Sequence, residues 1–64
     1  MKLFKATTKT VSTVTASEFA DWYDADTLED ARAMWSEDCH RYGLLMDKTS
    51  VEFVECNPET LKPV

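Results

Sequence analysis

The residues best suited to chemistry in this chain lie in one short stretch, Glu37-Asp38-Cys39-His40. Carboxylates, a thiolate and an imidazole can all bind a metal ion, and a cysteine beside a histidine can form a nucleophile with its base. Adjacent residues of a helix point about 100° apart, however, so Cys39 and His40 cannot easily grip one ion. The stretch therefore favours an outward, solvated His40 and a core Cys39 over a metal or catalytic centre.

Other catalytic patterns are weaker still. The only glycine, Gly43, cannot by itself make a phosphate-binding loop. The carboxylate pairs Glu29-Asp30 and Glu37-Asp38 fit a solvated helix surface better than a cleft. A chain of 64 residues also has too thin a core to wall a deep substrate pocket. We therefore expect no enzyme activity, no cofactor and no metal.

Length and composition indicate one small globular domain over residues 1–64, with 44% hydrophobic and 30% charged residues. No apolar run approaches the roughly 20 residues that cross a bilayer, and no leader pattern is seen, so we expect a cytoplasmic protein without membrane contact. Cys39 and Cys56 are expected to be reduced and mostly buried, with a disulfide left open as an alternative. Residues 57–64 are expected to form a loosely ordered tail.

The charge is negative and unevenly distributed. The formal net charge is −5, and residues 18–38 hold eight carboxylates against the single cation Arg32. Binding to nucleic acid needs clustered lysine and arginine, so direct contact with nucleic acid is not expected. An acidic patch of this density favours a basic partner instead.

The order of elements follows from hydrophobic periodicity. Residues 2–11 alternate as a strand, with Lys5, Thr7 and Lys9 on its wet face, and residues 18–25 and 50–56 are the other predicted strands. A helix is predicted between the second and third strands. The expected fold is α+β, ββαβ, with a three-stranded antiparallel sheet and one amphipathic helix packed on one face. The other face of the sheet is then open.

The helix has clear end signals. Asp26 and Thr27 are good N-caps, and Gly43 falls where a left-handed residue ends a helix. The apolar face predicted to be buried consists of Leu28, Ala31, Trp35, Cys39 and Tyr42. We expect it to pack against Phe4, Tyr23, Val51 and Phe53.

Trp22 admits two interpretations. Tyr23 and Ala25 share the parity that leads into the helix, so Trp22 and Ala20 are expected on the open face of the sheet. There Trp22 either covers a small second cluster with Leu3 or Val54, or serves as an exposed aromatic anchor for a partner.

Three segments carry a family resemblance: Phe4-Lys5-Ala6-Thr7, Ala25-Asp26-Thr27-Leu28-Glu29-Asp30-Ala31 and Val51-Glu52-Phe53. With these segments the chain resembles the small T7-like bacteriophage proteins that inhibit host RNA polymerase. The resemblance implies a phage-encoded protein that docks on a host enzyme and blocks it. It also implies that an acidic strip on the helix takes part in docking, here Glu29, Asp30 and Glu37. Glu55, Cys56 and Asn57 stand where that family would carry arginines.

Three hypotheses for function follow. The first is a phage-type inhibitor or modulator of a host macromolecular enzyme, with RNA polymerase as the target implied by the resemblance. The second is a DNA mimic that occupies the nucleic-acid channel of a restriction, CRISPR or repair nuclease. The third is a structural or assembly protein that dimerises through its sheet. The chain is expected to be a monomer or a weak homodimer. The predicted partner-binding residues are Asp21, Trp22, Asp24, Glu29, Asp30 and Glu37.

Overall fold

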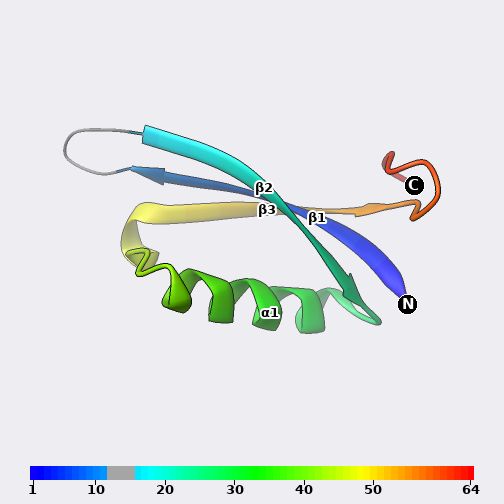
Figure 1. Ribbon diagram of the computed structural model, residues 1–64, viewed down its shortest axis with the longest axis horizontal. Helices are drawn as coiled ribbons and strands as arrows, with labels where there is room; N and C mark the ends of the chain where they lie inside the picture. Colours follow the sequence, from blue (N-terminus) through cyan, green and yellow to red (C-terminus); the bar gives the residue numbers. More distant parts are fainter. Residues whose placement is uncertain (12–15) are drawn as a thin grey trace.

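The computed structural model describes residues 1–11 and 16–64, and it contains a three-stranded antiparallel sheet with one helix packed against it (Figure 1). The elements in chain order are β1 (Lys2–Val11), β2 (Ala16–Ala25), α1 (Leu28–Arg41), the 3-10 helix η1 (Met46–Lys48) and β3 (Thr49–Cys56). The strand order is β2-β1-β3, so β1 is the central strand. The predicted ββαβ fold is confirmed, although β2 and β3 both begin earlier than the sequence suggests.

The alternation of side chains along β1 from Phe4 to Thr8 decides which residues meet the helix. Phe4, Ala6 and Thr8 are buried, and the register pairs Phe4 with Tyr23 of β2. Lys5 has the opposite parity and pairs with Trp22. Because successive side chains of a strand point to opposite faces, Trp22 lies on the open face of the sheet, as predicted.

Both ends of α1 are fixed by local capping. The Thr27 hydroxyl accepts a hydrogen bond of 3.2 Å from the backbone N–H of Asp30, which satisfies one of the free amides of the first turn. At the other end Gly43 adopts φ of 72°, a left-handed conformation that favours glycine. The N–H groups of Gly43 and Leu44 then donate to the carbonyls of His40 and Cys39, the pattern of a Schellman cap.

The core lies between α1 and one face of the sheet. Ala31, Trp35 and Cys39 are the buried residues of the helix. The Trp35 ring meets Phe53 edge to face, with ring centroids 6.1 Å apart. The cluster combines these residues with sheet side chains, and its members are Phe4, Ala6, Tyr23, Ala25, Ala31, Trp35 and Cys39, with Leu44, Val51 and Phe53 packed against them.

Two residues of the predicted apolar helix face do not join the core. Leu28 is 44% exposed and Tyr42 is 66% exposed, so the prediction that both are buried is wrong. Leu28 is the first residue of α1 and Tyr42 is its C-cap. Each therefore has helical neighbours on one side only. The helical period alone does not show how far along the helix the sheet covers it.

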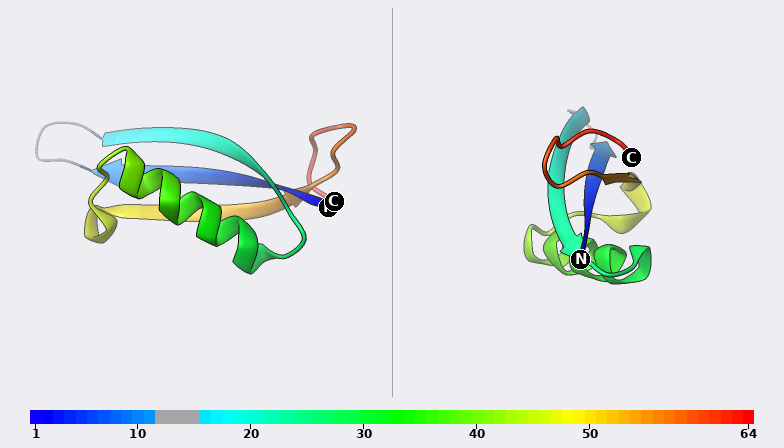
Figure 2. Two further views of the ribbon diagram at one scale, coloured as in Figure 1. Left: turned by 60° about the horizontal axis from the view of Figure 1, so that its bottom comes forward. Right: turned by 90° about the vertical axis from the view of Figure 1, so that its right-hand side faces the viewer.

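The C-terminal residues fold back on the side of the sheet opposite the helix (Figures 1 and 2). The sequence suggests a loosely ordered tail here. The structure gives Val64 an N–H bond of 3.1 Å to the carbonyl of Glu55, and Pro63 forms an antiparallel bridge with Cys56. These contacts place residues 57–64 against the end of β3.

Candidate functional site

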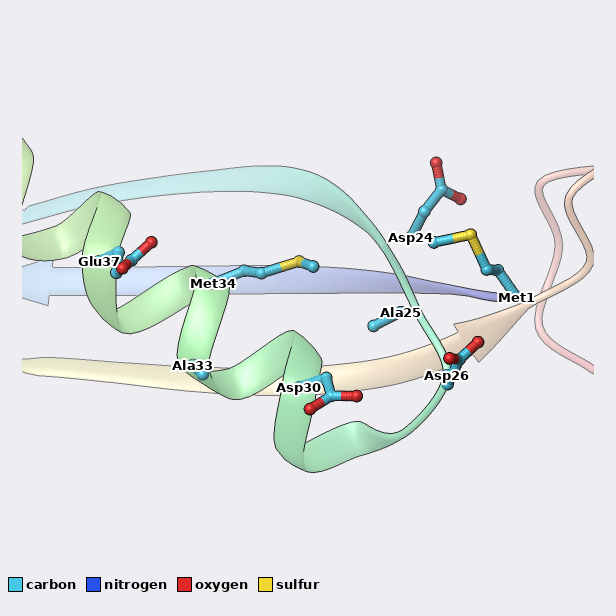
Figure 3. Close-up of a pocket in the computed structure, with 8 residues that line it drawn as sticks. All are labelled: Met1, Asp24, Ala25, Asp26, Asp30, Ala33, Met34 and Glu37. Carbon is cyan, nitrogen blue, oxygen red and sulfur yellow. The ribbon is translucent and has the colours of Figure 1, made fainter.

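A hollow of about 360 Å³ lies between the end of β2 and the outer side of α1 (Figure 3). We call it the acidic hollow, and its lining residues are Met1, Asp24, Ala25, Asp26, Asp30, Ala33, Met34 and Glu37. In Figure 3 the Met34 side chain extends from α1 toward β2, and the carboxylates lie on different sides of it. The hollow thus combines acidic groups with thioether and alanine surface.

Helical spacing and the turn after β2 together bring these residues to one place. Asp30, Met34 and Glu37 are separated by four and three residues, so they share one side of α1. The Thr27 cap starts the helix immediately after Asp26 and thereby sets which side of α1 faces the end of β2. Ala25 is only 2% exposed, and its small side chain lets the chain turn closely against the helix.

The basic side chains lie elsewhere. Five of them contact other groups: Lys2 with Glu55, Lys5 with the Trp22 ring, Lys9 with Glu18, Arg32 with the Phe53 ring, and Arg41 with Asp38. Within residues 1–11 and 16–64, none of the four carboxylates of the acidic hollow forms an ion pair. Four carboxylates without an ion-pair partner in the described part of the chain therefore lie together at the hollow.

Three of the six predicted partner-binding residues come together in the structure. Asp24, Asp30 and Glu37 meet at the acidic hollow. Glu29 is exposed in the first turn of α1 but does not line the hollow, and Trp22 lies on the open face of the sheet. Asp21 is half-buried on the helix side, because it shares the parity of Tyr23. The structure therefore gathers Asp24, Asp30 and Glu37 and leaves Asp21, Trp22 and Glu29 outside the hollow.

Five residues that line the hollow are not among the predicted site residues, namely Met1, Ala25, Asp26, Ala33 and Met34. The sequence predicts Asp26 as a helix cap and as part of the acidic stretch 18–38, but not as a binding residue. Met34 stands four residues after Asp30, a spacing that places the two on one side of a helix. Met1 carries no such signal, because its place depends on the antiparallel pairing of β1 with β2.

A second hollow, of about 260 Å³, lies on the open face of the sheet. It is lined by residues of all three strands and the C-terminal segment, namely Lys5, Thr7, Lys9, Glu18, Glu52, Val54, Cys56, Leu61 and Pro63. Beside it Trp22 is 42% exposed, with the Lys5 ammonium 5.7 Å from the centre of its ring. This face carries side chains of both signs of charge, whereas the charged side chains that line the acidic hollow are all acidic.

The helix side of β2 holds a partly buried polar contact. The Tyr23 hydroxyl donates a hydrogen bond of 2.7 Å to the Asp38 carboxylate. Burial raises the pKa of Tyr23 well above its ordinary value, and the hydrogen bond and the charge of Asp38 raise it further. Burial also raises the pKa of the Cys39 thiol, with smaller contributions from Asp38 and Asp21. Cys39 is thus held as a neutral thiol, the opposite of what a nucleophile requires.

The cysteines and the histidine are placed apart. Cys39 and Cys56 are both buried and unbonded, and they lie on opposite faces of the sheet, since Cys56 pairs with Leu3 of the open-face parity. His40 is exposed, whereas its neighbour Cys39 is in the core. Among the described residues no three histidine, cysteine or carboxylate side chains are grouped so that they could hold a metal ion.

Comparison of the chain with models of protein families, with curated proteins and with solved structures found no match. In the described part of the chain no helix has the length and apolar character needed to cross a membrane.

Proposed function

We propose that this protein binds a basic surface of a macromolecular enzyme through the acidic hollow and inhibits or modulates that enzyme. The observation that carries the proposal is the gathering of four unpaired carboxylates around Met34 and Met1 at the end of β2. A surface of one charge sign with an adaptable apolar floor suits the side chains of lysine and arginine.

The chemistry of those side chains explains the fit. Lysine and arginine have long aliphatic stems that pack on apolar surface while the charged end stays among polar groups. Methionine is flexible and polarizable, so it adjusts its shape to such a stem. The carboxylates of Asp24, Asp30 and Glu37 can accept hydrogen bonds from the charged end of the lysine or arginine.

The resemblance to the T7-like phage inhibitors makes bacterial RNA polymerase the first enzyme to test. The acidic strip that the resemblance implies includes Asp30 and Glu37, which both line the acidic hollow. Glu55, Cys56 and Asn57, at the end of β3 and just after it, occupy the positions where that family would carry arginines, so no group of basic residues contributes a second contact there. We therefore assign the larger part of the binding energy to the acidic hollow.

A DNA mimic would use the same charges differently. It presents many phosphate-like groups to a channel, and each contributes a small and similar share of the affinity. The apolar floor made by Met34 and Ala33 has no counterpart in a phosphate backbone. This floor favours docking on a protein surface, where one or two anchors dominate.

The test uses two triple variants with the same change in charge. Asp24→Asn, Asp30→Asn and Glu37→Gln neutralise the acidic hollow, and Asp47→Asn, Glu52→Gln and Glu59→Gln neutralise three exposed acids elsewhere. Each triple variant is immobilised and exposed to bacterial lysate and to purified RNA polymerase, in parallel with the parent protein.

We expect the parent and the second triple variant to retain the same enzyme and to lower its activity, and the first triple variant to lose both effects. Equal retention by the two triple variants would contradict the proposed site. The same six acids are also neutralised one at a time and affinity is measured across salt; equal small losses, with a steep dependence of affinity on salt, would favour the DNA mimic. Retention of a nuclease in place of RNA polymerase would change the target but leave the docking surface intact.

A further inference from the structure

The two edge strands of the sheet are not equally available. At the end of β3, Pro63 bridges Cys56 and the N–H of Val64 donates to the carbonyl of Glu55, so the chain itself covers that part of the edge. No described strand lies along the outer side of β2 over its ten residues. On an edge strand every second residue directs its backbone N–H and C=O away from the sheet. β2 thus offers a long row of backbone groups.

Proline, lysine and bulges, which commonly protect an edge, are absent from β2, and the charged residues that it does carry are all acidic. Its pairing with β1 runs through ten consecutive residue pairs, from Lys2 with Ala25 to Val11 with Ala16, without a bulge to twist the edge away. The edge is regular enough to accept another strand along its length.

The charge of β2 decides between possible occupants. The strand carries Glu18, Asp21 and Asp24 and no basic residue, and its end leads into the acidic hollow. A second copy paired through β2 would bring six carboxylates together with no basic residue of β2 between them. A strand with lysine or arginine at every second position would place cations beside Glu18, Trp22 and Asp24, which share one face.

We propose that β2 accepts, by strand addition, an extended basic segment of the partner protein, and that a lysine or arginine just beyond that segment enters the acidic hollow. This inference rests on the proposed function and specifies how the partner is held. Backbone hydrogen bonds to β2 supply a contact that does not depend on side-chain identity, and the alternating cations give the selectivity.

The first experiment uses a ten-residue peptide of alternating lysine and valine with blocked ends, matched to the length of β2. Two control peptides carry N-methyl groups on the lysine residues or on the valine residues. Each control keeps the charge and removes the hydrogen bonds of one edge of the peptide. Affinities are measured at low salt, and amide hydrogen exchange is followed residue by residue in β2 and β3.

We expect the parent peptide to bind and to slow exchange at alternate β2 amides at least tenfold, with β3 unchanged. At least one N-methylated peptide should bind tenfold more weakly. If both controls bind as well as the parent, or if the parent peptide fails to bind, strand addition is wrong. Slowed β2 exchange that depends on protein concentration without peptide would show that a second copy occupies the edge, which also overturns the inference.

The outcome is separable from that of the proposed function. If neutralising the acidic hollow abolishes capture of the enzyme, but the exchange rates of the β2 amides are unchanged in the complex of the parent protein, the docking site is supported and strand addition is wrong. If the β2 amides are protected by the peptide but both triple variants capture the enzyme equally, the edge accepts a strand and the proposed docking site is wrong.

Discussion

The indole Nε1–H of Trp35 donates a hydrogen bond of 2.9 Å to the hydroxyl oxygen of Thr8, across the buried interface between α1 and β1. Thr8 is fully buried, and it is the one buried polar side chain among the described residues. The bond therefore satisfies a donor that burial would otherwise leave without a partner, and it fixes where the helix sits along the central strand.

Replacing Thr8 by valine keeps the shape of the side chain and removes this acceptor. Because the Trp35 N–H is then buried without a partner, we expect the free energy of unfolding to fall by about 1–3 kcal/mol. Thermal unfolding followed by circular dichroism measures the change. Thr7→Val is the matched control, since Thr7 lies on the open face beside Ala20 and should tolerate the change. Equal melting temperatures for the two variants would contradict a structural role of the bond.

The packing of Trp35 itself is tested by truncation. Trp35→Ala removes the ring that meets Phe53 and leaves a cavity, so we expect a loss of roughly 3–5 kcal/mol. That loss approaches the whole stability expected for so small a domain, and the variant should be largely unfolded at 37 °C. Trp35→Phe keeps most of the packing and should fall between the parent and Trp35→Ala in urea unfolding. A Trp35→Ala variant that unfolds like the parent would refute this core.

Trp22 is expected to behave in the opposite way. Its ring is 42% exposed and its described cation contact is with Lys5, a contact worth about 0.5–1 kcal/mol at an exposed site. Trp22→Ala should therefore change the melting temperature little and weaken binding of the enzyme captured from lysate at least tenfold, as removal of an aromatic anchor does. Trp22→Phe is the control that keeps an aromatic ring. Normal binding by Trp22→Ala, or its unfolding, would assign Trp22 to a structural cluster.

Stability should decrease at alkaline pH. The pKa values of Tyr23 and Cys39 are raised in the folded protein, whereas in the unfolded chain they titrate near their ordinary values of 10.0 and 9.0. Above about pH 9 the unfolded chain therefore loses protons that the folded chain keeps, and the free energy of unfolding falls as pH rises. Below that range this contribution is fully present.

Urea unfolding between pH 7 and 10.5 measures the slope of stability against pH. Cys39→Ala should flatten the slope near pH 9, and Tyr23→Phe should flatten it near pH 10, whatever each substitution does to stability at pH 7. A parent protein whose stability is constant across this range would contradict the burial of both groups.

Local patterns were enough to predict most of the fold. The Thr27 cap, the left-handed Gly43 and the alternation of Phe4 with Lys5 each depend on neighbours in sequence, and the structure contains all of them. The exposure of Leu28 and Tyr42 escaped prediction, because it depends on how far the sheet extends over the ends of α1.

The candidate site was predicted only in part for a related reason. Asp30 and Glu37 could be placed together from helical spacing, but the hollow exists because α1 packs with one side against the end of β2. This packing brings together residues that are far apart in the sequence, so no local sequence pattern indicates that Met1 lines the hollow. Asp21 and Trp22 are consecutive residues of a strand, and they necessarily point to opposite faces.

The uneven distribution of charge on the protein also affects how it approaches a partner. The carboxylates of the acidic hollow gather at one end of β2, and Lys5 and Lys9 of β1 lie on the open face of the sheet, so this uneven charge gives the protein an electric dipole. A positively charged surface exerts a torque on such a dipole and turns the acidic side forward before the two proteins touch. Salt should therefore slow association strongly and leave the rate of dissociation nearly unchanged.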